Sequence, residues 1–175
     1  MPVSATVDQP SRLNLPFLLK MAGVASIIVI AGAAFTSRYH LGYDSQEVKC
    51  IGNYSFFLVD RKDTQLTRGN IYAFSAERVE PYFDDGTQFV KILMGLPGDH
   101  IQITDDERVL VNGEDVGRGL ILAEDLGLTA DGFVGETVLE EGHYWFMGET
   151  PYSFDSRYWG TVTEEQIIGK ARPLI

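Results

Sequence analysis

Hydrophobic residues follow two different patterns in this chain, one near the N-terminus and one over the rest of the sequence. Residues 15–35 are almost continuously apolar, with Lys20 as their single charge. A membrane-spanning helix needs about twenty such residues, and a lysine near its end can reach the interface with its ammonium group. The pattern therefore predicts a transmembrane anchor over residues 15–36, preceded by a polar cytoplasmic tail over residues 1–14.

Two other interpretations of the apolar segment are open. A buried core helix would need a polar face, and this segment is apolar on every side. A cleaved signal peptide is the second alternative, because small residues follow the apolar run at positions 31–34. We favour the uncleaved anchor.

Beyond residue 36 the apolar positions occur in short runs or alternate with polar ones, which is the period of a strand. Turn signals separate these runs, including Asn112-Gly113 and Glu141-Gly142. One stretch, residues 120–128, has a helical pattern, and residues 36–49 read as a linker. The chain from 37 to 175 is thus predicted to be one mainly β domain, a barrel or folded sheet. The predicted strands are residues 54–60, 70–75, 88–94, 100–104, 108–111, 143–147 and 167–174.

One of these strands carries a charge in an apolar setting. Lys91 shares a strand face with Phe89 and Leu93 and is followed by the turn Gly95-Leu96-Pro97-Gly98-Asp99. A desolvated lysine loses part of the advantage of its charged form and can act as a general base. The alternative is a lysine on a solvated strand face.

A second motif lies near the C-terminus, where the sequence reads Ser153-Phe154-Asp155-Ser156-Arg157-Tyr158-Trp159-Gly160. A catalytic lysine needs a partner group to hold it, because a lysine with three rotatable donors is poorly oriented by itself, and this motif is a candidate for such a partner. The alternative is a structural turn with an exposed ion pair.

Taken together, the two motifs resemble the type I signal peptidase family, and within it the TraF-type peptidases of bacterial conjugation, over roughly residues 45–175. The resemblance implies a coiled, mainly antiparallel β fold. It also implies that Lys91 is the general base, that Ser153 orients it, and that Asp155 and Arg157 form a supporting ion pair. The residues before this serine depart from the family sequence Gly-Asp-Asn-Arg-Asp-Asn, and the segment here is one residue shorter.

The nucleophile is the second departure from the family. Where the conjugation peptidases have a serine before a hydrophobic strand, this chain has Cys50, its only cysteine. A thiol ionises far more readily than a hydroxyl, so a Cys50–Lys91 dyad is chemically sensible. The alternatives are Ser45 or Ser55 as nucleophile, or no nucleophile, with Cys50 as a buried packing residue. The family's side-chain hydroxyl for the oxyanion hole is absent, because its position is occupied by Val48.

Charge and composition limit the classes of partner and cofactor that we expect. The 175 residues carry a net charge of −11, and 12 basic and 24 acidic residues follow residue 36. Such an acidic domain is a poor candidate for binding nucleic acid. The three histidines match no metal-ligand spacing, and we expect neither metal nor cofactor. Arg12 and Lys20 lie on the N-terminal side of the apolar span, which favours a cytoplasmic N-terminus and a periplasmic catalytic domain on a single-pass inner-membrane anchor.

The sequence therefore predicts a signal-peptidase-like endopeptidase that cleaves a pilin precursor or another secreted protein in a conjugation or type IV secretion machinery. Cyclisation of the pilin after cleavage is a further outcome that the resemblance allows. A catalytically silent pilus-assembly factor on the same scaffold is the main alternative. A self-cleaving repressor of the LexA type is a remote one, because the membrane segment and the acidic surface argue against it.

Overall fold

The computed structural model describes residues 14–175 and divides the chain into two compact units, one ending at Ser37 and one comprising Arg38–Ile175. The polar tail predicted over residues 1–14 lies, except for its last residue, outside the described residues. Each unit is described by itself below.

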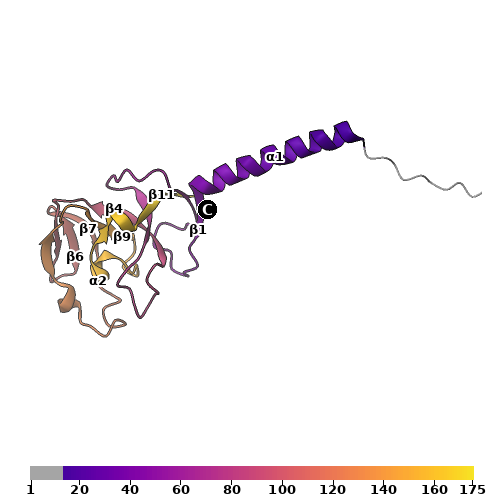
Figure 1. The fold of residues 1–175 in the computed structure, drawn as a ribbon. Coiled ribbons are helices and arrows are strands. Elements are labelled where there is room, and N and C mark those ends of the chain that lie inside the picture. The colour runs from indigo at the N-terminus through magenta and orange to yellow at the C-terminus, as the bar shows by residue number, and fades with distance from the viewer. Residues whose placement is uncertain (1–13) are drawn as a thin grey trace, which may run out of the picture. The chain divides into compact units, whose positions relative to one another are not determined.

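The described part of the first unit is a single long helix, α1 (Leu15–Arg38), whose last residue belongs to the second unit (Figure 1). Pro16 stands in its first turn, where a missing N–H costs no hydrogen bond, and no other proline follows in the helix. All its side chains are exposed within the unit, and among the described residues it is the one helix long and apolar enough to cross a membrane. The helix extends two residues past the predicted end of the anchor at residue 36.

The second unit is mainly β, which confirms the predicted fold class. Its larger sheet has seven antiparallel strands in the order β1-β2-β11-β3-β4-β9-β10. The last strand of the chain, β11, lies between β2 and β3 and pairs with both. The C-terminal segment therefore joins the first two strands to the rest of the sheet. The strands are β1 (Tyr39–Tyr43), β2 (Phe56–Asp60), β3 (Ile71–Ser75), β4 (Gln88–Gly95), β9 (His143–Met147), β10 (Val162–Thr163) and β11 (Ile167–Pro173).

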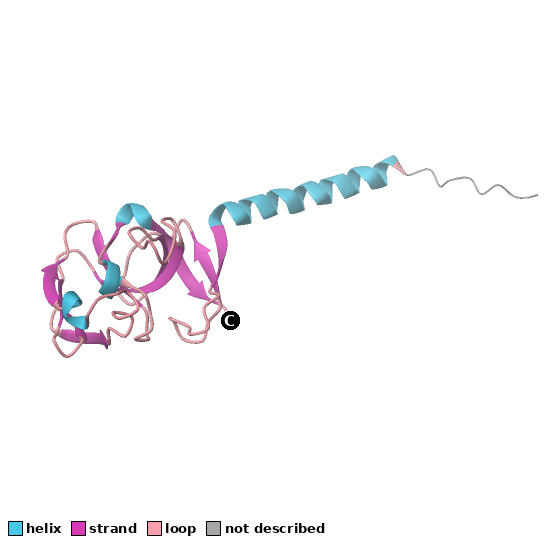
Figure 2. Ribbon diagram, turned by 90° about the horizontal axis from the view of Figure 1, so that it is seen from below, coloured by secondary structure: helices cyan, strands magenta, loops and turns pink. Residues whose placement is uncertain are grey.

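A smaller antiparallel sheet has the order β7-β6-β5-β8, and short helices lie in the connections (Figure 2). Its hairpin β6–β7 turns at Asn112 and Gly113, both with positive φ, as the Asn-Gly signal predicts. The strands are β5 (His100–Ile103), β6 (Arg108–Val111), β7 (Glu114–Arg118) and β8 (Gly135–Val138), and the helices are η1 (Ala130–Phe133), α2 (Ser156–Trp159) and η2 (Glu164–Gln166).

The core consists of separate apolar clusters, one of which supports the candidate site. One cluster joins the small sheet to Trp145 and Met147 of β9. Another is aromatic and fills the middle of the large sheet around Phe74 and Phe146. The third cluster, which supports the candidate site, includes Cys50. This residue packs with apolar side chains of β2, β3 and β11: Phe57, Val59, Ala73 and Ala171.

Two sequence predictions are wrong. Residues 120–128 form consecutive turns and not a helix, because Gly127 has a φ of 70° and the chain folds back through a Leu128 N–H to Ala123 carbonyl bond. The predicted linker over 36–49 contains β1, whose five residues pair with β2 from Tyr39↔Asp60 to Tyr43↔Phe56. The strand β8 was not predicted, since all its residues are exposed and it lacks an alternating pattern.

The Gly95–Asp99 turn connects the two sheets, and the carboxylate of Asp99 holds it. Its oxygens accept hydrogen bonds from the Leu96 N–H at 2.6 Å, from Arg68 at 2.7 Å and from Asn112 at 2.7 Å. Gly98 adopts a φ of 86°, which an L side chain rarely adopts. The motif thus fixes the end of the strand that carries Lys91.

Candidate active site

Lys91 lies in the middle of β4, where its neighbour across the ladder is Tyr72 of β3. Its side chain shares the inward face with Leu93, and the residue is only 5% exposed. The ammonium nitrogen donates a hydrogen bond to the Ser153 hydroxyl at 2.8 Å. Among residues 14–175 no carboxylate forms an ion pair with it, so a neutral hydroxyl is its polar partner.

Ser153 is fully buried and is fixed through its own backbone. Its N–H donates to the Thr150 carbonyl at 3.2 Å, and its carbonyl accepts from Arg157 Nη2 at 3.2 Å. Gly148 lies so close that an added Cβ would be 2.7 Å from the Ser153 Cβ and 2.9 Å from the Cys50 carbonyl oxygen. Only glycine therefore fits at position 148 without a shift of its neighbours.

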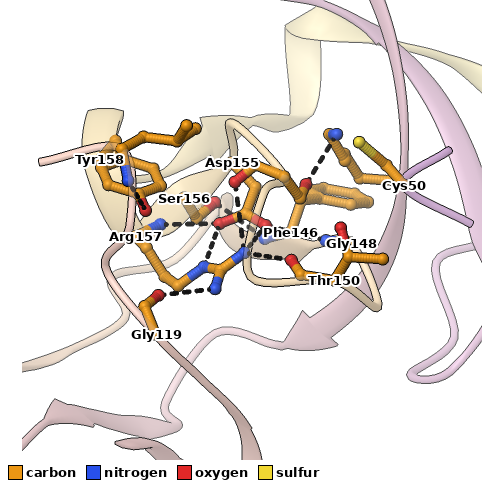
Figure 3. A network of polar contacts seen from close by, with 12 residues as sticks. Cys50, Gly119, Phe146, Gly148, Thr150, Asp155, Ser156, Arg157 and Tyr158 are labelled. Atoms are coloured by element: carbon orange, nitrogen blue, oxygen red, sulfur yellow. Dashed lines mark hydrogen bonds and ion pairs between the residues drawn. The ribbon is translucent and has the colours of Figure 1, made fainter. Parts of the chain in front are cut away.

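The Asp155–Arg157 pair is buried beneath the site (Figure 3). Arg157 binds the carboxylate in a bidentate manner, with Nε and Nη2 each at 2.8 Å from one oxygen. Two parallel charge-assisted bonds of this kind are strong and geometrically specific. A buried position excludes the alternative of an exposed ion pair.

The remaining donors of Arg157 bind backbone carbonyls from different segments. Nη1 donates to the Gly119 carbonyl at 2.8 Å, and Nη2 to that of Thr150 at 2.9 Å. Burial by itself lowers the pKa of the Arg157 guanidinium, but the hydrogen bonds and charge of Asp155 outweigh it and raise the pKa above its usual value. Arg157 is thus a permanent cation that ties the loop holding Ser153 to the loop after β7.

Asp155 and Ser156 complete this support from the start of α2. Asp155 accepts from the Gly148 N–H at 2.9 Å and caps α2 by accepting from the Arg157 N–H at 3.2 Å. The Ser156 hydroxyl accepts from the Phe146 N–H at 2.9 Å, which anchors α2 to β9. The motif from 153 to 157 therefore acts as one rigid support.

Cys50 lies in the loop between β1 and β2 and is 4% exposed. Its thiol donates to the Gln46 amide oxygen at 3.3 Å. Its carbonyl accepts from the Glu149 N–H at 2.7 Å, while the Glu149 carboxylate accepts from the Gly52 N–H at 2.6 Å. Glu149 thus clamps the Cys50 loop to the loop that precedes Ser153, and Figure 3 shows Cys50 at one end of the resulting network.

One cavity of about 310 Å³ has both Cys50 and Lys91 in its wall. Ser45 also lines it, whereas Ser55 does not. The Ser55 N–H donates to the Ile175 carbonyl and its own carbonyl accepts from the Asp44 N–H, so its backbone is used to join β1, β2 and the C-terminus. The rest of the wall comes from β1 and the loop after it, from β2, β3 and the start of β4, and from further aromatic residues, among them His40, Leu41, Gln46, Phe83, Phe89 and Phe154.

The structure brings all five sequence-predicted site residues into one region, and it adds two that the sequence did not single out. Gln46 and Glu149 make direct contacts with the Cys50 thiol and the Cys50 loop. Neither is part of an apolar pattern. Gln46 contacts the thiol because the loop that carries both residues folds back over four positions, whereas Glu149 contacts the Cys50 loop because two loops distant in sequence meet. The one sequence signal was the departure of residues 148–152 from the family motif.

Comparison with known proteins defines the class of this fold and site. The family model described as signal peptidase, peptidase S26, matches residues 15–175. The chain therefore belongs to the S26 signal peptidase family.

Several relatives are signal peptidases. Signal peptidase I of Pseudomonas fluorescens is 32% identical over 151 residues, which cover 65% of this chain and 51% of the relative. Signal peptidase I T of Bacillus subtilis (strain 168) is 30% identical over 115 residues, covering 62% and 56%. The chain thus spans about half the length of these curated relatives.

Another relative and a solved structure are also similar to parts of this chain. The conjugal transfer protein TraF of Agrobacterium fabrum (strain C58 / ATCC 33970) is 30% identical over 86 residues, which cover 49% of this chain and 47% of the relative. A crystal structure of a signal peptidase I from Enterococcus faecalis V583 has a TM-score of 0.40 and 24% identity, covering 61% of this chain and 96% of the other.

Proposed function

We propose that this protein is a membrane-anchored endopeptidase in which Cys50 is the nucleophile and Lys91 the general base. The observation that carries the proposal is the shared cavity, because Cys50 and Lys91 both lie in its wall. The lysine nitrogen is bonded to the Ser153 hydroxyl and, within residues 14–175, forms no ion pair with a carboxylate. Because no carboxylate pairs with Lys91 within residues 14–175, its amine can take the thiol proton without first breaking an ion pair. Asp155 and Arg157 support this arrangement from below.

The first half-reaction is acyl transfer to sulfur. Lys91 takes the Cys50 thiol proton, and the thiolate attacks the carbonyl carbon of the scissile bond. A C–S bond forms while the carbonyl π electrons move to oxygen, which gives a tetrahedral oxyanion. Collapse of this intermediate breaks the C–N bond, and the Lys91 ammonium gives its proton to the leaving amine.

The second half-reaction frees the enzyme. Water attacks the thioester carbon as Lys91 takes one of its protons, and the C–S bond breaks to give the carboxylic acid and the Cys50 thiolate. The Lys91 ammonium then returns its proton to the thiolate, which restores the thiol and the neutral amine. If an amine of the substrate replaces water, the same thioester gives a new amide, and the chain ends are joined. Hydrolysis and cyclisation are therefore two outcomes of one acyl-enzyme.

The substrate we propose is the leader or tail of a pilin precursor, or of another secreted protein, in a conjugation or type IV secretion system. The partial similarity to a conjugal transfer protein supports this context. An apolar helix of 24 residues supports anchoring in the inner membrane, and Arg12 before it and Lys20 in its N-terminal part favour a periplasmic catalytic unit. A reporter fused after Ile175 should be active in the periplasm, and activity in the cytoplasm would reverse the orientation.

Mass spectrometry of the pilin tests the peptidase proposal directly. The pilin should be processed in cells with the native protein and remain a full-length precursor with Cys50→Ala, whereas Ser45→Ala and Ser55→Ala should process it. Cys50→Ser should retain partial activity and resist a thiol-alkylating reagent that inactivates the native protein. Full processing by Cys50→Ala would move the nucleophile elsewhere, and a full-length pilin in every strain would favour the silent assembly factor.

A further inference from the structure

We infer that Gln46 supplies the side-chain donor of the oxyanion hole, in the role that a hydroxyl at position 48 cannot fill here. This inference rests on the proposed cysteine peptidase activity and names a further residue of that site. Gln46 is not conspicuous in the sequence; its contact with the thiol is what identifies it.

The need for such a donor follows from the residues around Cys50. A tetrahedral oxyanion is stabilised by preorganised hydrogen-bond donors, and each donor contributes strongly to the rate. The Cys50 N–H forms no hydrogen bond within residues 14–175 and is one available donor. Val48 has an exposed hydrocarbon side chain and offers none. A second donor must therefore come from another residue of the cavity.

Gln46 is the amide side chain in contact with the nucleophile. Its Oε1 lies 3.3 Å from the Cys50 sulfur and accepts the thiol proton's hydrogen bond, while its Nε2 has no acceptor among the described residues. A half-turn about the Cγ–Cδ bond exchanges the two atoms, because an amide has nearly the same shape in both orientations. Once the thiol proton has passed to Lys91, the amide no longer has a donor to accept from and can present Nε2–H to the developing oxyanion.

The backbone around Gln46 is fixed, as a preorganised donor requires. The Asp44 carboxylate accepts from the Gln46 N–H at 2.9 Å, and the Asp44 carbonyl accepts from Lys49 Nζ at 2.7 Å. The Asp44 N–H in turn donates to the Ser55 carbonyl at 2.8 Å, at the foot of β2. The loop from 44 to 50 is thus closed on itself and joined to the sheet, with Gln46 and Cys50 in the wall of one cavity.

The first test compares kcat and KM of the full-length, detergent-solubilised protein on its pilin precursor. Gln46→Ala should lower kcat roughly 10- to 100-fold with little change in KM, because the donor acts on charge that develops only in the transition state. Gln46→Glu keeps the shape but replaces the donor by a carboxylate, and it should be slower still. Glu47→Gln, an exposed neighbour outside the cavity, is the matched control and should retain native kinetics.

The second test uses the peptide aldehyde N-acetyl-alanyl-leucyl-alaninal, whose adduct with the thiol carries the same oxygen. Gln46→Ala should bind this aldehyde at least 10-fold more weakly, whereas alkylation of Cys50 by iodoacetamide should still go to completion in the folded variant. Native kcat and aldehyde affinity in both Gln46 variants would overturn the inference and leave the peptidase proposal intact. If the native protein neither cleaves the precursor nor binds the aldehyde, the proposed function fails, and this inference falls with it.

Discussion

The ammonium nitrogen of Lys91 lies 2.8 Å from the hydroxyl oxygen of Ser153, although 62 residues separate the two in the sequence. Both residues are buried, and the lysine has no carboxylate partner within residues 14–175. The serine therefore restricts the direction of a long side chain that would otherwise have several rotamers. It is a positioning residue, and the lysine is the group that exchanges the proton.

The first prediction concerns Ser153. Ser153→Ala removes the hydrogen-bond acceptor that the buried lysine nitrogen has within residues 14–175, which should destabilise the fold by about 1–3 kcal/mol. We expect kcat for precursor cleavage to fall roughly 10- to 100-fold through loss of orientation, with KM nearly unchanged. Thermal unfolding and steady-state kinetics measure the two effects. A purely structural serine would lower stability and leave kcat per folded molecule at the native value.

The second prediction concerns the proton acceptor. Lys91→Ala should abolish processing, with a loss of at least about 10²–10⁴-fold, which is the range for general acid–base catalysis. Lys91→Arg should not restore it, because a guanidinium does not release its proton near neutral pH. Pilin mass spectra and membrane fractionation show processing and insertion. An active arginine variant would exclude Lys91 as the base.

The sequence predicted the parts of this protein whose signals are local. Lys91 could be assigned to the inward strand face from its apolar neighbours, and the hairpin after β6 from Asn112-Gly113. The helix over 120–128 was wrong because a local apolar period does not include the tertiary contacts that close turns there. The strand β1 could not be predicted, since its pairing with β2 depends on a partner more than ten residues away.

The site residues that belong to a sequence motif could be predicted. The contacts that loops make within and between themselves could not. The Ser153–Arg157 motif predicted an ion pair but not its burial, which depends on carbonyls such as that of Gly119 on a separate loop. Gln46 and Glu149 lie in polar loops with no periodicity. Glu149 meets the Cys50 loop only through the fold, and Gln46, four residues before Cys50, contacts the thiol only because the loop after β1 folds back on itself.

The third prediction concerns the buried ion pair. Arg157→Lys replaces a planar group that makes two parallel bonds by a single ammonium, and leaves carbonyls of two loops without a donor. Each buried acceptor left without a donor costs about 1–3 kcal/mol, so we expect a large drop in melting temperature and loss of processing. Arg118→Lys, an exposed arginine on β7, is the control. Native stability of Arg157→Lys would contradict the structural role given to this pair.

The fourth prediction tests the close packing at Gly148. Gly148→Ala places a Cβ within 3 Å of Ser153 and the Cys50 carbonyl, so both sides of the site must move. Such overpacking costs about 1–3 kcal/mol. The cleavage rate should fall by more than the loss of folded protein accounts for. Gly132→Ala is the matched control, because nothing lies within 4 Å of its added Cβ. Equal activity of the two variants would show that the site tolerates the displacement.

The last prediction is a pH dependence that arises from Asp99. Burial raises the pKa of this carboxyl, but hydrogen bonds from the Leu96 N–H, Asn112 and Arg68 outweigh it, and the net pKa is below the usual 3.8. A carboxyl whose pKa is lowered by folding contributes stability above its unfolded pKa, and that contribution is lost as the pH falls through the folded value. The native protein should therefore unfold at a higher temperature than Asp99→Asn at pH 7, with a difference that shrinks steadily below about pH 4. Melting curves of both proteins from pH 7 to pH 2 measure this, and a constant difference over that range would exclude Asp99 as its source.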